Sequence, residues 1–158
     1  MSYYIESMLP QMENNFQFRP LQKTDYHSSY FSLLRQLTSC NDDRIPIPIF
    51  ENFVENLQEN HQIWVIEDTN TKKIVATGTL WIEQKIIHDM GKVGHIEDIV
   101  IDQHSRGYKY GLMIVNHLRN IASEKGCYKS ILDCKDHLEY FYKKCGFTKK
   151  GIQMSINH

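Results

Sequence analysis

The sequence predicts an α/β fold in which a central mixed β-sheet is flanked by helices. Short segments of alternating apolar residues, typical of strands, are interleaved with segments whose apolar residues recur every three or four positions, typical of helices. The chain has 158 residues, which suits one domain. Hydrophobic residues make up 41% and charged residues 23%, ordinary values for a globular protein that needs neither disulfides nor metal to fold.

Each expected element follows from its local pattern. Turn residues and prolines bound the apolar runs that we interpret as strands, at 16–20, 62–67, 73–83, 93–101, 129–134 and 151–157. We expect helices after the N-cap residues Thr24 and Asp25, after a proline-containing turn at 45–48, from Tyr110 to Gly126, and over 137–145. Residues 1–15 are polar and aperiodic, so we expect a flexible tail there and one domain over 16–158.

Composition argues against several classes of function. No apolar run approaches about 18 residues, and the N-terminus lacks the basic and apolar regions of a secretory signal. We therefore expect a cytoplasmic protein with no membrane partner. The four cysteines and eight histidines show no metal-ligand spacing, so no metal is expected.

Charge is distributed unevenly along the chain. From Arg106 to Lys150 there are ten basic and four acidic residues, whereas the first 105 residues hold eight basic and fifteen acidic. Duplex DNA usually needs a broadly basic face, so no nucleic-acid partner is expected. The asymmetry suits a small polyanion bound on one side and an amine on the other. A solvated charge imbalance without function is the alternative.

Three sequence blocks point to a specific chemistry: KIIHDMGKVGHIEDIVID (85–102), GCYKSILDC (126–134) and FYKKCGF (141–147). In order and spacing they resemble blocks of the glucosamine-6-phosphate N-acetyltransferases of the GNAT superfamily, and the likeness runs from about Phe16 to the C-terminus. The resemblance implies a GNAT acetyltransferase fold, with acetyl-CoA as cosubstrate and glucosamine 6-phosphate as acceptor. The product would be N-acetylglucosamine 6-phosphate for UDP-N-acetylglucosamine biosynthesis. A homodimer is also implied, with the last strand reaching across to the partner.

Two carboxylates and two cationic side chains define the expected acceptor site. In an extended strand Glu97 and Asp98 point to opposite faces, so one can face a pocket while the other is solvated. Lys85 and His88 offer the cations that a sugar phosphate needs, provided that the chain bends near Ile87. Exposed surface charge is the alternative for these residues. The resemblance implies a substrate site of Thr38, Lys85, Ile86, Ile87, His88, Glu97, Asp98, Ile99, Asp133 and Cys134.

The segment RGYKYG, Arg106 to Gly111, is expected to bind the pyrophosphate of CoA. It lies between a strand and a helix, where backbone N–H groups at a helix N-terminus converge on an anion. Lys109 stands where related loops carry a glycine, so the loop either bears the strain of a left-handed lysine or takes another path. A polar strand-to-helix turn is the alternative. The resemblance implies a cofactor site of Ile99, Val100, Ile101, Arg106, Gly107, Tyr108, Lys109, Tyr110, Gly111, Tyr142, Lys143 and Lys144.

The resemblance assigns the acetyl transfer to Glu97, Asp133 and Tyr142. Glu97 would take the amine proton through water, Asp133 would lie beside the amine, and the Tyr142 hydroxyl would stabilise or protonate the departing thiolate. For Tyr142 the alternative is a core aromatic. Cys134 has no histidine placed to activate it, so we expect a buried structural thiol there.

Two positions depart from the pattern of the family. Leu138 stands where many relatives have an asparagine that contacts the cofactor arm, and Asn157 where relatives have an arginine that pairs with the substrate phosphate. A neutral amide cannot make a bidentate ion pair. Two rival functions therefore stay open. One is a GNAT N-acetyltransferase for another amine, such as a polyamine or a protein N-terminus; the other is a non-catalytic acyl-CoA-binding protein.

Overall fold

The computed structural model describes residues 15–158, so the expected tail lies outside the described residues apart from Asn15. The strands are β1 (Phe16–Pro20), β2 (His61–Asp68), β3 (Lys73–Gln84), β4 (Lys92–Ile101) and β5 (Cys127–Ile131). The α-helices are α2 (Tyr30–Leu34), α3 (Ile47–Glu55), α4 (Ile87–Met90), α5 (Tyr110–Glu124) and α6 (Glu139–Lys144). Short 3-10 turns lie at Lys23–His27, Asp42–Arg44, Gln103–Ser105 and Asp136–Leu138.

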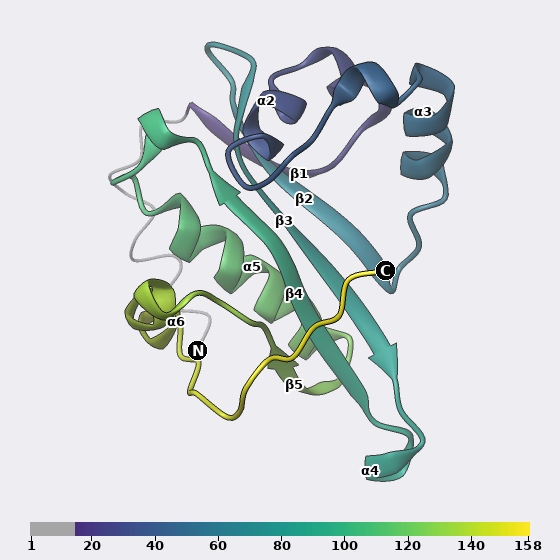
Figure 1. Cartoon of the computed structure of the whole chain (residues 1–158), viewed down its shortest axis with the longest axis vertical. Coiled ribbons are helices and arrows are strands. Elements are labelled where there is room, and N and C mark those ends of the chain that lie inside the picture. Colours follow the sequence, from purple (N-terminus) through teal and green to yellow (C-terminus); the bar gives the residue numbers. More distant parts are fainter. Residues whose placement is uncertain (1–14) are drawn as a thin grey trace.

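The strands follow one another in the sheet in chain order, β1-β2-β3-β4-β5 (Figure 1). Strands β1 to β4 pair with one another in antiparallel fashion and β5 is parallel to β4, so the predicted mixed sheet is confirmed. Antiparallel neighbours need only turns, whereas a parallel step needs a crossover, which α5 provides. No helix within residues 15–158 combines the length and apolarity needed to span a bilayer.

Alternate residues of the central strands enter two separate cores. On one face of the sheet, Leu80 and Ile96 pack with Leu118 of α5. On the other face, Val100 packs with Phe31 of α2 and Phe50 of α3. The face covered by α2 and α3 is called the α2–α3 face below. This alternation is the reason that a strand pattern with apolar residues at nearly every position is compatible with helices on both sides.

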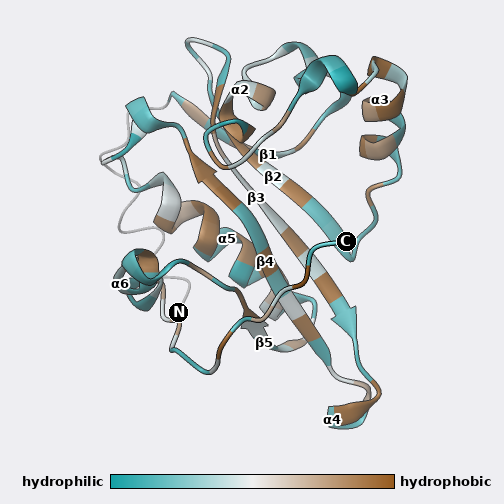
Figure 2. Ribbon diagram, viewed as in Figure 1, coloured by the Kyte–Doolittle hydropathy of each residue, from teal (hydrophilic) through white to brown (hydrophobic). Residues whose placement is uncertain are grey.

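The hairpin between β3 and β4 ends in α4, at the far tip of the molecule (Figure 1). His88, Asp89 and Met90 have left-handed backbone, with φ of 55°, 54° and 60°. The bend that the sequence analysis required near Ile87 is therefore present. The side chains of Ile86, Ile87 and Met90 are exposed, and Figure 2 shows the tip as largely apolar.

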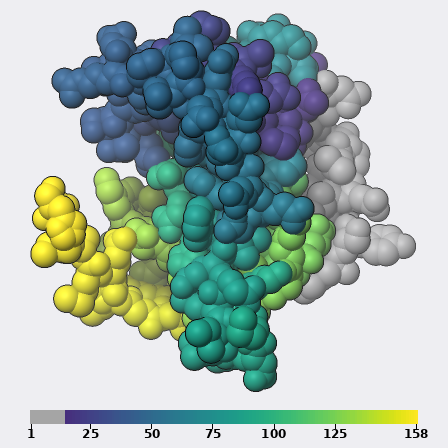
Figure 3. All heavy atoms as spheres, turned by 90° about the vertical axis from the view of Figure 1, so that its right-hand side faces the viewer, coloured from purple at the N-terminus to yellow at the C-terminus, as the bar shows by residue number. Residues whose placement is uncertain are grey.

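Three predicted elements differ from the structure. The predicted final strand at 151–157 is wrong, because this segment pairs with no strand of the described chain and its residues are exposed. Figure 3 shows it projecting from the body of the molecule. Strand β5 ends at Ile131 rather than at residue 134, because the chain leaves β4 there. The helix expected after Thr24 is a 3-10 turn followed by the five residues of α2.

Candidate active site

The site opens where β4 and β5 diverge. The two strands pair only from Lys92 with Cys127 to His95 with Ile131. Beyond His95, β4 continues to Ile101, and its strand partner within residues 15–158 is β3. Backbone N–H and C=O groups on the β5 side of this stretch can therefore bind an extended ligand such as a pantetheine arm, much as a sheet edge binds an added strand.

A β-bulge bends β4 within this stretch. Glu97 pairs with Thr79, and the next two residues, Asp98 and Ile99, lie opposite the single residue Gly78. Asp98 takes a left-handed φ of 51°. A Cβ on Gly78 would lie 2.5 Å from Cδ1 of Ile99, so only glycine leaves room for this side chain.

The bulge makes the expectation of opposite faces for Glu97 and Asp98 wrong. Asp98 and Thr79 line one apolar pocket beneath α2 and α3, and Thr79 is the cross-strand partner of Glu97. Both carboxylates therefore lie on the α2–α3 face, because the extra residue of a bulge breaks the alternation of side chains. Burial raises the pKa of Glu97, and the negative charges of Asp133 and Asp98 raise it further. A carboxylate with a raised pKa is a stronger base.

The segment after β5 and helix α6 complete this group. Asp133, Cys134 and Tyr142 line one open groove of about 800 Å³. Burial raises the pKa of Tyr142 to about 12, and Cys134, Cys145, Asp133 and Glu97 add to the effect. The three residues expected to carry catalysis, Glu97, Asp133 and Tyr142, thus gather where β4 and β5 diverge. Cys134 is exposed, so the expectation of a buried thiol is wrong, because the chain has left the sheet there.

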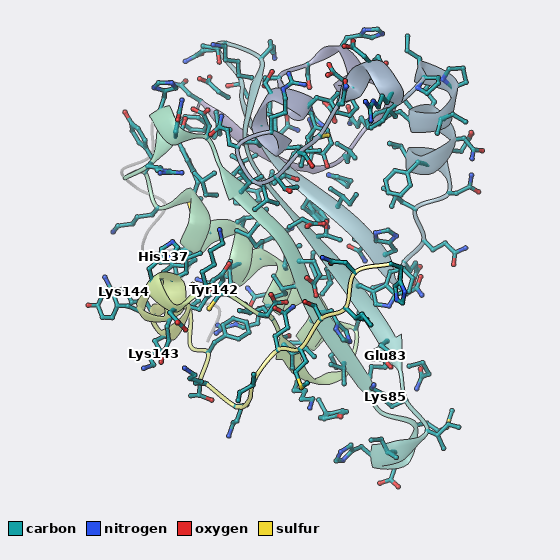
Figure 4. The ribbon with its side chains drawn as sticks, viewed as in Figure 1. Glu83, Lys85, His137, Tyr142, Lys143 and Lys144 are labelled. Carbon is teal, nitrogen blue, oxygen red and sulfur yellow. The ribbon has the colours of Figure 1, made fainter. Side chains whose placement is uncertain are left out.

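A stripe of alternating basic and acidic side chains leads from the hairpin toward Glu97. The Nζ of Lys85 lies 2.5 Å from Oε1 of Glu83, and Figure 4 shows both side chains at the same end of β3. The other oxygen of Glu83 lies 2.9 Å from Nε2 of His95, which is two residues from Glu97 along β4. Glu83 and His95 were not among the site residues expected from the sequence. Their two-residue spacing from Lys85 and Glu97 is the signal that was available.

The other expected acceptor residues lie outside this group. Ile86, Ile87 and His88 are exposed at the hairpin tip, where the His88 ring packs at 4.5 Å from that of Tyr128. Thr38 is exposed in the turn after α2. Cys40, two positions later, lines the same apolar pocket as Asp98.

At Lys109 the Arg106–Gly111 loop takes the left-handed backbone conformation that a glycine would permit. Lys109 has φ 63° and ψ 12°, so the loop bears the strain of a left-handed lysine, the first of the two predicted alternatives. The loop leads into the N-terminus of α5, a fifteen-residue helix whose first N–H groups have no partner within the helix. A Cβ on Gly111 would lie 3.0 Å from Phe141, so a side chain there would crowd α6.

Exposed groups surround this loop. Arg106, Tyr108 and Lys109 are exposed, and the Tyr108 ring stacks on Tyr110 with centroids 5.7 Å apart. On α6, Lys143 pairs with Glu139 at 2.7 Å, and Lys144 lies 4.4 Å from the centre of the Tyr140 ring. Figure 4 shows both lysines beside Tyr142 on α6. Leu138 is exposed just before this helix.

Known proteins share this architecture. Residues 23–147 match the model of the acetyltransferase (GNAT) family. A probable glucosamine 6-phosphate N-acetyltransferase 2 from Oryza sativa is 43% identical, over 89% of this chain and 86% of its own length. Glucosamine 6-phosphate N-acetyltransferase 1 from Dictyostelium discoideum is 39% identical, over 92% of both chains. The crystal structure of glucosamine-6-phosphate N-acetyltransferase from Arabidopsis thaliana superposes with a TM-score of 0.86 at 38% identity, covering 91% of this chain and 99% of that one. The chain belongs to the acetyltransferase (GNAT) family and is a homologue of glucosamine 6-phosphate N-acetyltransferases.

Proposed function

We propose that this protein is a cytoplasmic enzyme that transfers the acetyl group of acetyl-CoA to the amine of glucosamine 6-phosphate. The observation that supports this most directly is the grouping of Glu97, Asp133 and Tyr142 at the divergence of β4 and β5. The homologues that carry this name add the substrate. The product, N-acetylglucosamine 6-phosphate, would feed UDP-N-acetylglucosamine synthesis.

The residues of the chain fit acetyl-CoA. When bound, this cosubstrate supplies the thioester carbonyl that the amine attacks. The β5 side of β4 from Ile99 to Ile101 offers backbone groups to the pantetheine arm. Loop amides at the start of α5, with the cations of Arg106 and Lys109, would hold the pyrophosphate. Holding both substrates in one cleft supplies much of the rate acceleration.

Each catalytic residue has one role. Glu97, with its raised pKa, accepts the amine proton through water, and Asp133 orients the amine. Tyr142 donates a hydrogen bond to the sulfur as the thiolate forms. A phenol with a pKa of about 12 is a much weaker acid than a thiol near 8.5, so Tyr142 keeps its proton. This favours stabilisation of the thiolate over its protonation.

A panel of amines tests the function. Purified protein is incubated with acetyl-CoA and either glucosamine 6-phosphate, glucosamine, spermidine or a peptide amine, and CoA release is measured. The sugar phosphate should react at least about tenfold faster than glucosamine, because Lys85 forms a charge-assisted contact with the phosphate. Equal rates for glucosamine 6-phosphate and glucosamine would show that Lys85 and His88 do not bind the phosphate. Preference for spermidine or the peptide would favour another GNAT substrate, and no release with any amine would favour a non-catalytic acyl-CoA-binding protein.

Two variants of Lys109 separate charge from strain in the pyrophosphate loop. Both Lys109→Ala and Lys109→Gly should weaken CoA binding about three- to tenfold and flatten its salt dependence, because an exposed cation is lost. Only the glycine variant should also raise the free energy of unfolding, by about 1 kcal/mol, since glycine accepts positive φ. Calorimetric titration at two ionic strengths and thermal unfolding measure both effects. Wild-type affinity of Lys109→Ala at both ionic strengths would make Lys109 a solvated loop residue.

We further propose a homodimer. Ile152, Met154 and Ile156 are 90%, 91% and 79% exposed and alternate along the C-terminal segment, the spacing of one strand face. β5 is the last strand of the sheet within residues 15–158, and only its β4 side is paired. An exposed apolar strand and an open sheet edge on the same chain suit exchange between two copies.

A further inference from the structure

We propose that His95, anchored by Glu83, is a positioning residue that keeps Glu97 in its basic form for the acetyl transfer. The inference rests on the proposed function of the same site, and it assigns a role to a residue of the first sequence block that had none. His95 touches none of the reacting groups in this proposal. It acts through Glu97.

The strand register fixes the position of His95. It pairs with Trp81 of β3, while Glu97 pairs with Thr79, so both side chains lie on the same face of β4. Two residues along a strand correspond to about 7 Å. The Nε2 of His95 lies 2.9 Å from the carboxylate of Glu83, which holds the ring in place from the neighbouring strand.

Glu83, which anchors His95, is itself held in place by a second partner. Glu83 uses one oxygen for His95 and the other for Nζ of Lys85, at 2.5 Å. These two partners, Lys85 first, lower the pKa of Glu83, so it stays ionised and keeps its acceptor role. The result is a row of alternating basic and acidic side chains that ends at Glu97.

Charged groups around Glu97 explain why a cation is needed there. Asp98 from the bulge and Asp133 from the segment after β5 both oppose a negative charge on Glu97, and burial opposes it most. His95 acts in the other direction. From β5, Ile131 pairs with His95, and Lys129, two residues earlier, pairs with Val93. Without His95, Glu97 would hold its proton to a higher pH and would act as a base over a narrower pH range.

The pH dependence of kcat/KM for glucosamine 6-phosphate tests this role. In His95→Gln the acidic limb of this pH profile should move to higher pH by about half a unit to one unit. This is the size of shift expected for a unit charge about 7 Å away in a partly exposed site. At a pH below the limb this is about a three- to tenfold loss of kcat/KM, while the plateau at high pH should change less than about twofold. His95→Lys places a permanent positive charge at this position and should return the limb toward its original position. His95→Asn provides a second neutral variant if the first one does not fold.

A matched control and a second measurement keep the outcomes distinct. His61→Gln removes an imidazole that packs against Trp81 on the same face, with ring centroids 4.9 Å apart, and should leave the limb in place. The titration of the Glu97 carboxyl, followed by NMR without substrates, should move upward in His95→Gln. An unmoved Glu97 titration would overturn the inference. Failure of the wild-type enzyme to acetylate the sugar phosphate would instead overturn the proposed function, and the NMR result would still stand.

Discussion

Replacing Tyr142 with phenylalanine is expected to lower kcat about 100-fold, while KM changes less than about threefold. The hydroxyl is proposed to stabilise charge that exists only as the thiolate departs, and removing one such donor typically costs about 10²- to 10³-fold in kcat. Phenylalanine keeps the ring, which is 9% exposed and packs in the core, so the fold should survive. The loss should be constant from pH 6 to 9, because a phenol with a pKa of about 12 does not titrate there.

Tyr140→Phe is the matched control for this variant. Tyr140 lies on the same helix but is 70% exposed, so its hydroxyl has no part in the proposed chemistry. Steady-state rates of CoA release for both variants, with thermal unfolding to confirm the fold, make the comparison. If Tyr142→Phe turned over at the wild-type rate, Tyr142 would be a core aromatic, the alternative that the sequence left open.

The elements that the sequence predicted well are those determined by local patterns. The helix from Tyr110 was recognised because its apolar residues recur at helical spacing and Gly126, with φ 80°, lies just beyond its end. The left-handed path at Lys109 was one of two alternatives because the loop pattern reserves that position for glycine. Local chemistry specifies such features without knowledge of neighbouring strands.

The features that were missed depend on contacts between distant segments. The bulge at Asp98 arises from the pairing of β4 with β3, and the only local sign of it is Gly78 inside a strand, a position that often marks a bulge. The partnership of Glu83 with His95 depends on the same register across the hairpin. Cys134 was misplaced because the length of β5 is set by where it leaves β4.

The predicted strand at 151–157 shows how a correct local pattern can give no element in a single chain. Apolar residues alternate there, but a strand also needs a partner for its backbone N–H and C=O groups. Within residues 15–158 no strand pairs with this segment. The pattern and the structure agree if the partner is a second copy of the chain, which is the homodimer proposed above.

Deleting residues 151–158 is therefore expected to convert a homodimer of the 18.7 kDa chain into a monomer with little activity. The groove that holds Asp133 and Tyr142 is also lined by Gly151, Ile152 and Gln153, so loss of the segment disturbs the site itself. Light scattering gives the mass, and CoA release gives the activity. Circular dichroism shows whether the shortened chain still folds.

A pair of charge variants tests the interface without shortening the chain. Ile152→Asp with Met154→Asp places two carboxylates on the apolar side of the segment, whereas Gln153→Asp with Ser155→Asp places the same charges on the opposite side. All four positions are exposed in the single chain, so neither variant should destabilise a monomer. Burying an apolar side chain of this size contributes about 1.5–3 kcal/mol, so the first variant should weaken dimerisation at least about 100-fold and the second far less. An active, well-folded monomer in the wild-type protein, or a first variant that stays dimeric at the same concentration as the second, would show that the segment does not join two copies.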